Sequence, residues 1–188
     1  PVPAVDAAEG ERLAETIVAP TLHELRRRGI DYRGVLYAGL MLTADGPYVL
    51  EYNVRFGDPE AQVVLPRLDD DLAALLAEAA TGDLRSTPKV RPDAAVTVVA
   101  ATEGYPANPR TGDVIEGLDA VRAVEGVTVY CAGVATGPDG RLVTAGGRVL
   151  AVTGTGPTVQ VARARAYDGI ARVSWHGLHH RSDIATVR

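Results

Sequence analysis

Apolar residues recur at roughly helical spacing through the first periodic segment, residues 9–28. One stripe of such a helix would carry Leu13, Ile17, Leu22 and Leu25. This pattern predicts an amphipathic helix with one buried face. Pro20 lies inside the segment and predicts a kink, because proline lacks the amide hydrogen that a helical ladder needs. Gly29 follows the last turn and predicts the end of the helix.

A hairpin and two helices are predicted next. Residues 32–43 and 48–52 are strand-like, and Ala44-Asp45-Gly46-Pro47 between them is a turn signal. Helices are then predicted over residues 59–65 and 70–80. Asp69 or Asp70 would cap the second of these helices.

The segment 81–92 separates two different patterns. It contains Gly82, Pro88 and Pro92, and such a composition predicts a domain boundary. We therefore expect one domain over residues 1–88 and a second over residues 89–188.

The second half of the chain is predicted to be mostly antiparallel strands. A β-branched run at residues 94–101 predicts one strand, and residues 127–135 and 141–153 predict more around the turn Pro138-Asp139-Gly140. A last helix from about residue 158 would carry a stripe formed by Val159, Ala162, Ala166, Ile170 and Val173. Antiparallel strands packed by a helix indicate an α+β fold class.

Composition narrows the class of protein. With 188 residues and 46% hydrophobic residues, the chain can bury a substantial core. Its net charge of −5 and the lack of a basic stripe argue against nucleic-acid binding. The single cysteine, Cys131, lies in a strand-like run, is predicted to be a small core residue, and fits a reducing compartment. No apolar run approaches the length of a membrane span, so we expect a cytoplasmic protein with no membrane contact.

The densest chemistry lies at the end of the second predicted strand. Alternation would place Glu51 and Asn53 on one face, and their oxygens are ligands that Mg²⁺ accepts when phosphates fill its other positions. Arg55 follows on the same face and suits a carboxylate or phosphate. Asp58 and Pro59 look like a helix cap followed by proline at the first helical position. Together these residues suggest phosphoryl chemistry, although a solvated strand end with an Arg55–Asp58 surface pair would give the same pattern.

Several runs along the chain together resemble one known family. They are YRGVLYAGLMLT at residues 32–43, VLEYNVRFGDPE at 49–60, QVVLPRL at 62–68, EGYP at 103–106, GDVI at 112–115, GGRVLAVT at 146–153 and RSDI at 181–184. These runs resemble phosphoribosylamine–glycine ligase, also called glycinamide ribonucleotide synthetase, an ATP-grasp enzyme of purine biosynthesis. The resemblance covers roughly residues 9–184. It implies the C-terminal half of an ATP-grasp lobe over residues 1–88 and the family's C-terminal domain over residues 89–188.

The resemblance also implies a reaction and a set of site residues. In the family, ATP phosphorylates glycine, and 5-phosphoribosylamine attacks the glycyl phosphate to give glycinamide ribonucleotide, ADP and phosphate. Glu51 and Asn53 would be ligands of Mg²⁺ or Mn²⁺, and Arg55 would stabilise the transferred phosphoryl group. Asp58 and Glu60 would hold an ammonium group, with Asp58 acting in catalysis or as a plain helix cap. Glu103 and Tyr105 would contact the phosphoribosyl substrate.

Parts of the family pattern have no match in this sequence. The N-terminal substrate domain, the phosphate loop and the nucleotide-binding lysine are not matched, and the single lysine, Lys89, lies in the predicted linker. We therefore expect the C-terminal part of a longer enzyme, a monomer or weak dimer, that is inactive by itself. Two alternatives stay open at this point: another ATP-grasp carboxylate–amine ligase, and a non-catalytic module of the same fold.

Two further motifs have competing interpretations. Gly146-Gly147 could form an anion nest from consecutive amides, or a bulge or tight turn entering the next strand, and we favour the bulge or turn. His176, His179 and His180 could suggest a metal cluster, but no cysteine or nearby carboxylate completes it before Asp183. We expect these histidines to be structural or solvated.

Overall fold

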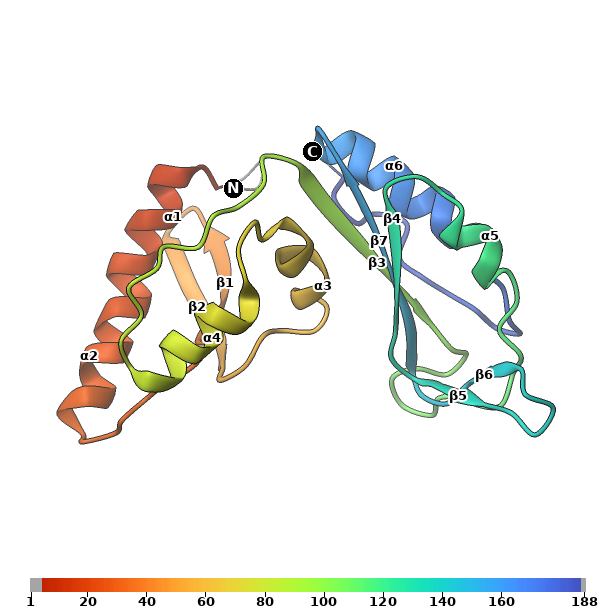
Figure 1. Ribbon diagram of the computed structural model, residues 1–188, viewed down its shortest axis with the longest axis horizontal. Helices are drawn as coiled ribbons and strands as arrows, with labels where there is room; N and C mark the ends of the chain where they lie inside the picture. The colour runs from red at the N-terminus through yellow and green to blue at the C-terminus, as the bar shows by residue number, and fades with distance from the viewer. Residues whose placement is uncertain (1–4, 187–188) are drawn as a thin grey trace. The chain divides into compact units, whose positions relative to one another are not determined.

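The computed structural model describes residues 5–186, which divide into two compact units (Figure 1). The first unit contains residues 5–57 and 70–88, and the second contains residues 58–69 and 89–186. The predicted domain division between residues 88 and 89 stays a prediction; in the structure the short segment 58–69 belongs to the second unit. No helix among the described residues is both long and apolar enough to cross a membrane.

A nearly continuous helix opens the first unit. It comprises α1 (Ala7–Leu13), a π-helical segment η1 (Ala14–Val18) and α2 (Ala19–Arg27). The π-helical segment ends two residues before Pro20, which has no amide hydrogen to donate to the residue four positions earlier, so the hydrogen-bond ladder changes its spacing in this region. Near the end of α2, Arg27 and then Arg28 hold the pKa of Glu24 at about 2 through hydrogen bonds to its carboxylate.

The hairpin of the first unit is formed by β1 (Tyr37–Thr43) and β2 (Gly46–Asn53), paired antiparallel with a bulge between Gly39 and Leu40. It exposes large apolar side chains, namely Met41, Leu42, Tyr48, Val49, Leu50 and Tyr52. Helix α4 (Leu72–Thr81) completes the unit. Its last carbonyls, on Ala80 and Thr81, accept hydrogen bonds from the Arg33 guanidinium.

The core of the second unit is a three-stranded antiparallel sheet in the order β3-β7-β4, formed by β3 (Ala94–Ala101), β7 (Arg148–Gly156) and β4 (Val127–Cys131). One face of this sheet packs against α6 (Val159–Ile170), through a buried cluster that includes Val98, Val152 and Ala166. Gly154 allows the helix to approach, since a Cβ there would lie 2.2 Å from the Ala162 carbonyl oxygen. The opposite face carries Thr97 and Thr153.

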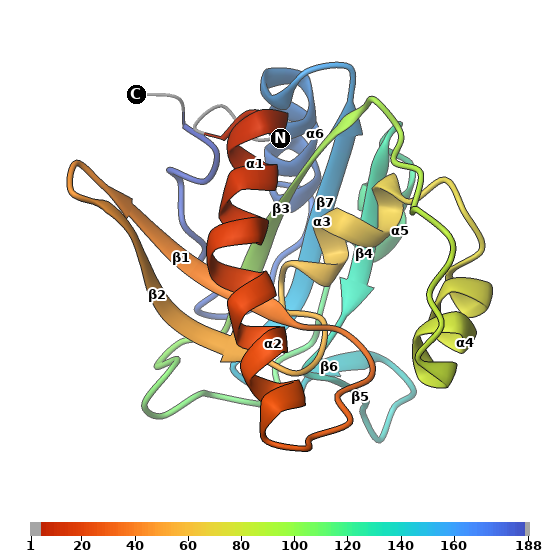
Figure 2. The same ribbon diagram turned by 90° about the vertical axis from the view of Figure 1, so that its left-hand side faces the viewer.

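A short helical segment lies on that second face. It consists of α3 (Ala61–Val64) and the 3₁₀ turn η2 (Leu65–Arg67). The two views show α3 and α6 on opposite sides of the sheet (Figures 1 and 2). The threonine hydroxyl of Thr153 reaches the Gln62 carbonyl at 3.1 Å, so the polar side of β7 is used to anchor α3.

Smaller elements complete the second unit. They are α5 (Leu118–Arg122) and the hairpin of β5 (Val134–Thr136) and β6 (Leu142–Thr144). The segment after α6 returns along the sheet, where His179 and Ala101 exchange backbone hydrogen bonds of 3.0 and 2.9 Å. His179 therefore lies beside the end of β3.

The predicted α+β class and the antiparallel pairing are confirmed, with local corrections. The first strand begins at Tyr37 and not at residue 32, and the helix predicted over residues 59–65 is α3 followed by η2. The predicted strand at residues 127–135 is two strands separated at Gly133, and the one at 141–153 is divided before Arg148. The cap of α4 is Asp71, whose Oδ1 accepts from the amides of Ala73 and Ala74, so the predicted cap at Asp69 or Asp70 was wrong. Cys131 is exposed at the end of an edge strand and is not a core residue.

Candidate functional site

Glu51 and Asn53 lie at the end of β2 and are joined to each other. The amide nitrogen Nδ2 of Asn53 donates to Oε1 of Glu51 at 2.9 Å. Opposite them on β1, Gly39 pairs with Glu51, and a Cβ at Gly39 would lie 3.3 Å from the Glu51 Cγ. The glycine thus gives the Glu51 side chain room above the hairpin. Asn53 Oδ1 and Glu51 Oε2, the two oxygens outside this hydrogen bond, are hard oxygen donors at the same strand end.

This donor pair fits a divalent cation whose other ligands are phosphate oxygens and water. One carboxylate and one amide oxygen are suitable for Mg²⁺ or Mn²⁺, which are commonly held by one or two protein groups plus phosphates and water. Between residues 5 and 186 no three His, Cys, Asp or Glu side chains are grouped so that they could hold a metal ion. Phosphate oxygens of a substrate would therefore have to supply further ligands.

Arg55 follows Asn53 in the bend after β2. Its Nη1 donates to the Phe56 carbonyl oxygen at 2.9 Å, and its side chain is exposed. Most of its five N–H donors are directed to solvent. The geometry therefore leaves this guanidinium able to contact an anion.

Asp58 has two partners within the second unit. Gln62 Nε2 donates to its Oδ1 at 3.0 Å, and Arg148 Nη2 donates to its Oδ2 at 2.9 Å. Arg148 Nη1 also donates to the Asp58 backbone carbonyl at 3.1 Å. The predicted helix cap at Asp58 was wrong, since the N-cap of α3 is Glu60 and no side chain caps this helix. The carboxylate is instead engaged by side chains from α3 and β7.

Glu60 lies at the beginning of α3 and is half-buried. Its backbone carbonyl accepts from the amides of Val63 and Val64 at 3.0 and 2.9 Å. The backbone of Glu60 therefore starts the helix, which fixes the place from which its carboxylate projects.

Glu103 lies in the loop after β3, within a small group of charged side chains. Its Oε2 is 3.6 Å from His176 Nδ1, and its carbonyl accepts from the Arg110 amide at 2.9 Å. Arg110 in turn forms a two-pronged contact with Asp113. These hydrogen bonds, above all, hold the pKa of Asp113 below its ordinary value, and they raise the pKa of Arg110.

Tyr105 packs its ring directly on Gly147. A Cβ at Gly147 would lie 2.2 Å from Cδ2 of Tyr105, so only glycine fits beneath this ring. The peptide bond between Tyr105 and Pro106 is cis. Glu103 and Tyr105 are therefore brought together on one ordered loop of the second unit.

Gly146 and Gly147 lie in a bend before β7, which agrees with the predicted tight turn and not with an anion nest. A Cβ at Gly133 would lie 2.7 Å from the Gly146 Cα, and Gly147 lies beneath Tyr105. Neither Gly146 nor Gly147 has a positive φ, which a nest of alternating right- and left-handed residues would require. Close approach of the Gly133 backbone accounts for Gly146, and the Tyr105 ring accounts for Gly147.

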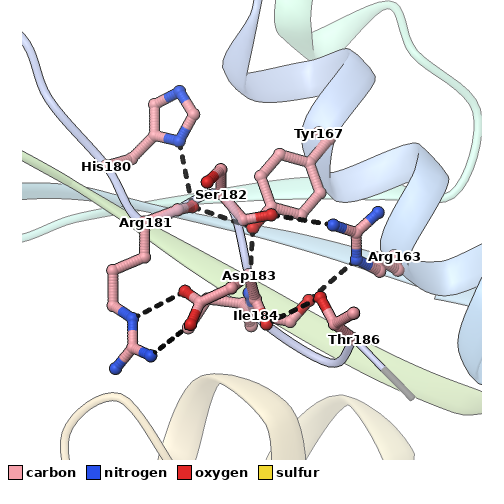
Figure 3. Close-up of polar contacts among 8 residues, drawn as sticks. All are labelled: Arg163, Tyr167, His180, Arg181, Ser182, Asp183, Ile184 and Thr186. Carbon is pink, nitrogen blue, oxygen red and sulfur yellow. Dashed lines mark hydrogen bonds and ion pairs between the residues drawn. The ribbon is translucent and has the colours of Figure 1, made fainter. Parts of the chain in front are cut away.

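The histidine segment contacts α6 (Figure 3). His180 Nδ1 lies 3.1 Å from the Arg181 carbonyl oxygen, and its ring is tilted against Tyr167. Arg163 lies 4.5 Å over the Tyr167 ring and donates to the carbonyls of Ser182 and Ile184, both at 2.8 Å. These contacts hold residues 180–184 along the helix, so His180 has a packing role.

Sequence reasoning assigned no role to Arg148 or Gln62. The two are the partners of Asp58, yet they lie 90 and 4 residues from it along the chain. The sequence did contain one indication of a role for Arg148: it is a charged residue at the start of a strand whose next four residues are apolar. Nothing in that run indicates which carboxylate it meets.

Two protein-family models match consecutive parts of the chain. The ATP-grasp (A) domain of phosphoribosylglycinamide synthetase matches residues 1–61, and the C domain of the same protein matches residues 95–187. The chain belongs to the phosphoribosylglycinamide synthetase family. The order of the two domains follows the order of the two predicted halves.

Curated proteins that are similar in sequence to this chain support the same family. The chain is 48% identical over 188 residues to a phosphoribosylamine–glycine ligase of Streptomyces coelicolor, covering 98% of this chain and 45% of the relative. It is 42% identical over 185 residues to the enzyme of that name from Brucella melitensis, covering 98% and 43%. The chain thus spans less than half the length of these curated relatives.

Two solved structures are similar to this chain in fold. A crystal structure of phosphoribosylamine–glycine ligase from Thermotoga maritima has a TM-score of 0.79 and 39% identity, covering 92% of this chain and 42% of that chain. N5-carboxyaminoimidazole ribonucleotide synthetase from the same organism has a TM-score of 0.54 and 19% identity, covering 76% and 37%. The second likeness concerns the fold alone.

Proposed function

We propose that this chain is the C-terminal part of a phosphoribosylamine–glycine ligase of purine biosynthesis. The observation that carries the proposal is the 48% identity over 188 residues to a protein of that name. The chemistry of the strand end agrees with it, because a hydrogen bond holds the carboxylate of Glu51 beside the amide of Asn53. The proposed reaction joins the carboxylate of glycine to the amine of 5-phosphoribosylamine at the expense of ATP.

The reaction requires two displacements. A glycine carboxylate oxygen attacks the γ-phosphorus of ATP and the bond to ADP breaks, giving glycyl phosphate. The amine nitrogen of phosphoribosylamine then attacks the acyl carbon, phosphate leaves, and the nitrogen gives up a proton as the amide forms. Both steps bring anionic or electron-rich groups together, so the protein must neutralise charge and align the partners.

Glu51 and Asn53 would hold a divalent cation, Mg²⁺ or Mn²⁺. Such an ion supplies positive charge at the phosphate oxygens of ATP. The role of the chain's own residues is to offer Glu51 Oε2 and Asn53 Oδ1 in a fixed orientation, and the hydrogen bond between the two side chains provides that orientation.

Arg55 is proposed to contact the transferred phosphoryl group, because its guanidinium is exposed and a planar fork suits phosphate. Asp58 and Glu60 are proposed to hold an ammonium or amine. A carboxylate has about four lone-pair sites, so Asp58 can still accept from an amine while it binds Gln62 and Arg148. Glu103 and Tyr105 are proposed to contact the phosphoribosyl substrate from their shared loop.

The rest of the machinery is proposed to lie in the part of the polypeptide that this chain does not include. The matched share of the relatives, 45% and 43%, supports this proposal. So does the hairpin of the first unit, which exposes Met41, Tyr48 and Leu50. Two strands rarely form a stable sheet alone. We also propose a cytoplasmic location, with ATP, glycine and phosphoribosylamine as the partners.

ADP release by the intact polypeptide tests the proposed function. The assay contains ATP, Mg²⁺, glycine and freshly formed phosphoribosylamine, and the 188-residue chain is run beside it. We expect ADP formation that requires both glycine and phosphoribosylamine in the intact protein, and none from the chain alone. Folded intact protein that releases ADP with a different carboxylate–amine pair would reject the glycine ligase in favour of a related ligase.

A further inference from the structure

The structure assigns to Arg148 the task of positioning Asp58 and the start of α3 for the proposed ligase reaction. This inference rests on the proposed function and adds a residue that the sequence did not implicate. Arg148 does not have to touch a substrate in this role. It acts through Asp58.

The first argument is the geometry of the contact. Arg148 contacts a single residue at two points, with Nη1 on the Asp58 carbonyl at 3.1 Å and Nη2 on Oδ2 at 2.9 Å. A contact to the backbone fixes the course of the chain, and the contact to the carboxylate fixes the side-chain rotamer. Gln62 Nε2, 3.0 Å from Oδ1, closes the other side of the carboxylate. Three hydrogen bonds thus define where Asp58 lies.

The second argument is that Arg148 lies on a strand of the sheet, whereas Asp58 lies in a connecting segment. Arg148 begins β7, the central strand of the sheet, and its carbonyl accepts from the Gly133 amide at 2.9 Å. The residue after it, Val149, is fully buried. Asp58 precedes α3 and belongs to no strand. A side chain on a strand therefore holds a connecting segment in place. Functional groups are positioned accurately when residues on such rigid elements support them.

The third argument concerns stability. The side chains of Arg148 and Asp58 are 40% and 46% exposed, and ion pairs with that much exposure add little to the stability of a fold. The Arg148–Asp58 contact therefore acts by fixing positions and not by stabilising the fold. Asp58 and Glu60 are separated by Pro59 alone, so the same contact sets the place from which Glu60 projects at the start of α3.

The test compares variants of the intact polypeptide by hydrogen exchange and by kinetics. The variants are Arg148→Ala, Arg148→Lys, Asp58→Asn and the double variant Arg148→Ala/Asp58→Asn. Arg172→Ala is the matched control, because Arg172 and Asp168 form a pair of similar exposure, 44% and 51%, on another part of the same unit. Amide exchange is followed over residues 58–65 and, for comparison, over β7. Thermal melting checks that each variant is folded.

We expect Arg148→Ala to speed exchange over residues 58–65 by about tenfold or more while β7 is unchanged, because a local hold has been removed. We expect kcat/KM for glycine and phosphoribosylamine to fall roughly 10- to 100-fold, as small displacements of reacting groups cost that much. Arg148→Lys should recover part of both effects, since an ammonium can make one of the two contacts. The double variant should exchange no faster than Arg148→Ala. Arg172→Ala should behave as wild type.

Three results would overturn the inference. One is an Arg148→Ala variant with unchanged exchange and unchanged kinetics. Another is lost activity with unchanged exchange, which would mean that Arg148 acts directly on a substrate. The third is faster exchange with unchanged activity, which would mean that the hold is not needed. If the wild-type polypeptide shows no dependence on glycine and phosphoribosylamine, the proposed function has failed instead, and the exchange measurements alone decide whether Arg148 holds Asp58.

Discussion

The hydroxyl of Thr153 on β7 lies 3.1 Å from the backbone carbonyl of Gln62 on α3. Position 66, four residues after Gln62, is Pro66, which has no amide hydrogen to offer that carbonyl. Thr153 is fully buried and lies 2.9 Å from the hydroxyl of Thr97 on β3. A threonine pair in the sheet thus satisfies a helix carbonyl that the helix itself cannot.

Replacing Thr153 with valine should destabilise the second unit by about 1 to 3 kcal/mol, because the Gln62 carbonyl and the Thr97 hydroxyl would each lose a buried partner. Valine keeps the shape of threonine, so the loss would be electrostatic rather than steric. Chemical denaturation of the intact polypeptide and its Thr153→Val variant measures the difference in the free energy of unfolding.

The double variant Thr97→Val/Thr153→Val is the control for that measurement. Removing both hydroxyls leaves no unpaired Thr97 hydroxyl, so of the two losses caused by Thr153→Val only that of the Gln62 carbonyl remains. The two substitutions should therefore destabilise less together than the sum of their separate effects. Strict additivity would contradict the hydrogen-bond chain.

Gly147→Ala should displace Tyr105, since the new Cβ would lie 2.2 Å from the ring carbon Cδ2. We expect a loss of about 1 to 3 kcal/mol in stability, as is usual for overpacking, and a raised KM for phosphoribosylamine. The double variant Tyr105→Ala/Gly147→Ala removes the clash and should lose less stability than the two changes added together. A Gly147→Ala variant with wild-type melting and kinetics would refute the packing of this ring on Gly147.

The elements that the sequence predicted well are those with a strong local period. The strand Ala94–Ala101 was predicted with its observed bounds from its β-branched run. The helix Val159–Ile170 was predicted from its apolar stripe, although that stripe ran on to Val173, three residues past the end of the helix. The hairpin turn at Ala44-Asp45 was also found, since turn residues carry their own backbone preferences. The antiparallel α+β architecture followed from these elements.

The features that the sequence could not predict are set by tertiary contacts. The strand break at Gly133 arises because Gly146 approaches within contact distance there, which no local pattern encodes. Asp58 is an acceptable cap residue by its type, but Arg148 and Gln62 engage its carboxylate first. At the candidate site, the pairing of Glu51 with Asn53 follows from strand alternation. The partners of Glu103 and Tyr105 depend on segments more than 40 residues away.

Glu51→Gln should lower the rate of ADP release by the intact polypeptide by roughly a hundredfold or more. The change removes one negative charge from the proposed metal ligands, and charge stabilisation by a bound ion is worth several kcal/mol in such reactions. Mn²⁺ binding, followed by electron paramagnetic resonance in the presence of ATP, should weaken in parallel. Asp45→Asn, at the exposed turn of the same hairpin, is the matched control and should change neither quantity. Near-normal rate and Mn²⁺ affinity in Glu51→Gln would remove Glu51 from the metal site.

The carboxylate of Asp113 should titrate below its ordinary pKa of 3.8, because the Arg110 guanidinium donates to both of its oxygens. A carboxylate whose pKa is lower in the folded state stabilises that state above the unfolded pKa, near 4. This stabilisation is lost as the pH falls from about 4 through the folded pKa.

NMR titration of the Asp113 carboxyl carbon in the intact polypeptide measures this pKa directly. Arg110→Gln should raise the pKa of Asp113 toward 3.8, since the hydrogen bonds from Arg110 are the largest cause of the shift and the smaller contribution from His176 remains. Arg122→Gln, on α5, removes an exposed guanidinium that contacts Asp119 instead and should leave the pKa of Asp113 unchanged. A pKa of Asp113 that does not respond to Arg110→Gln would show that the pair does not order the loop from Glu103 to Arg110. The proposed contact of Glu103 with the phosphoribosyl substrate would then need another source of rigidity.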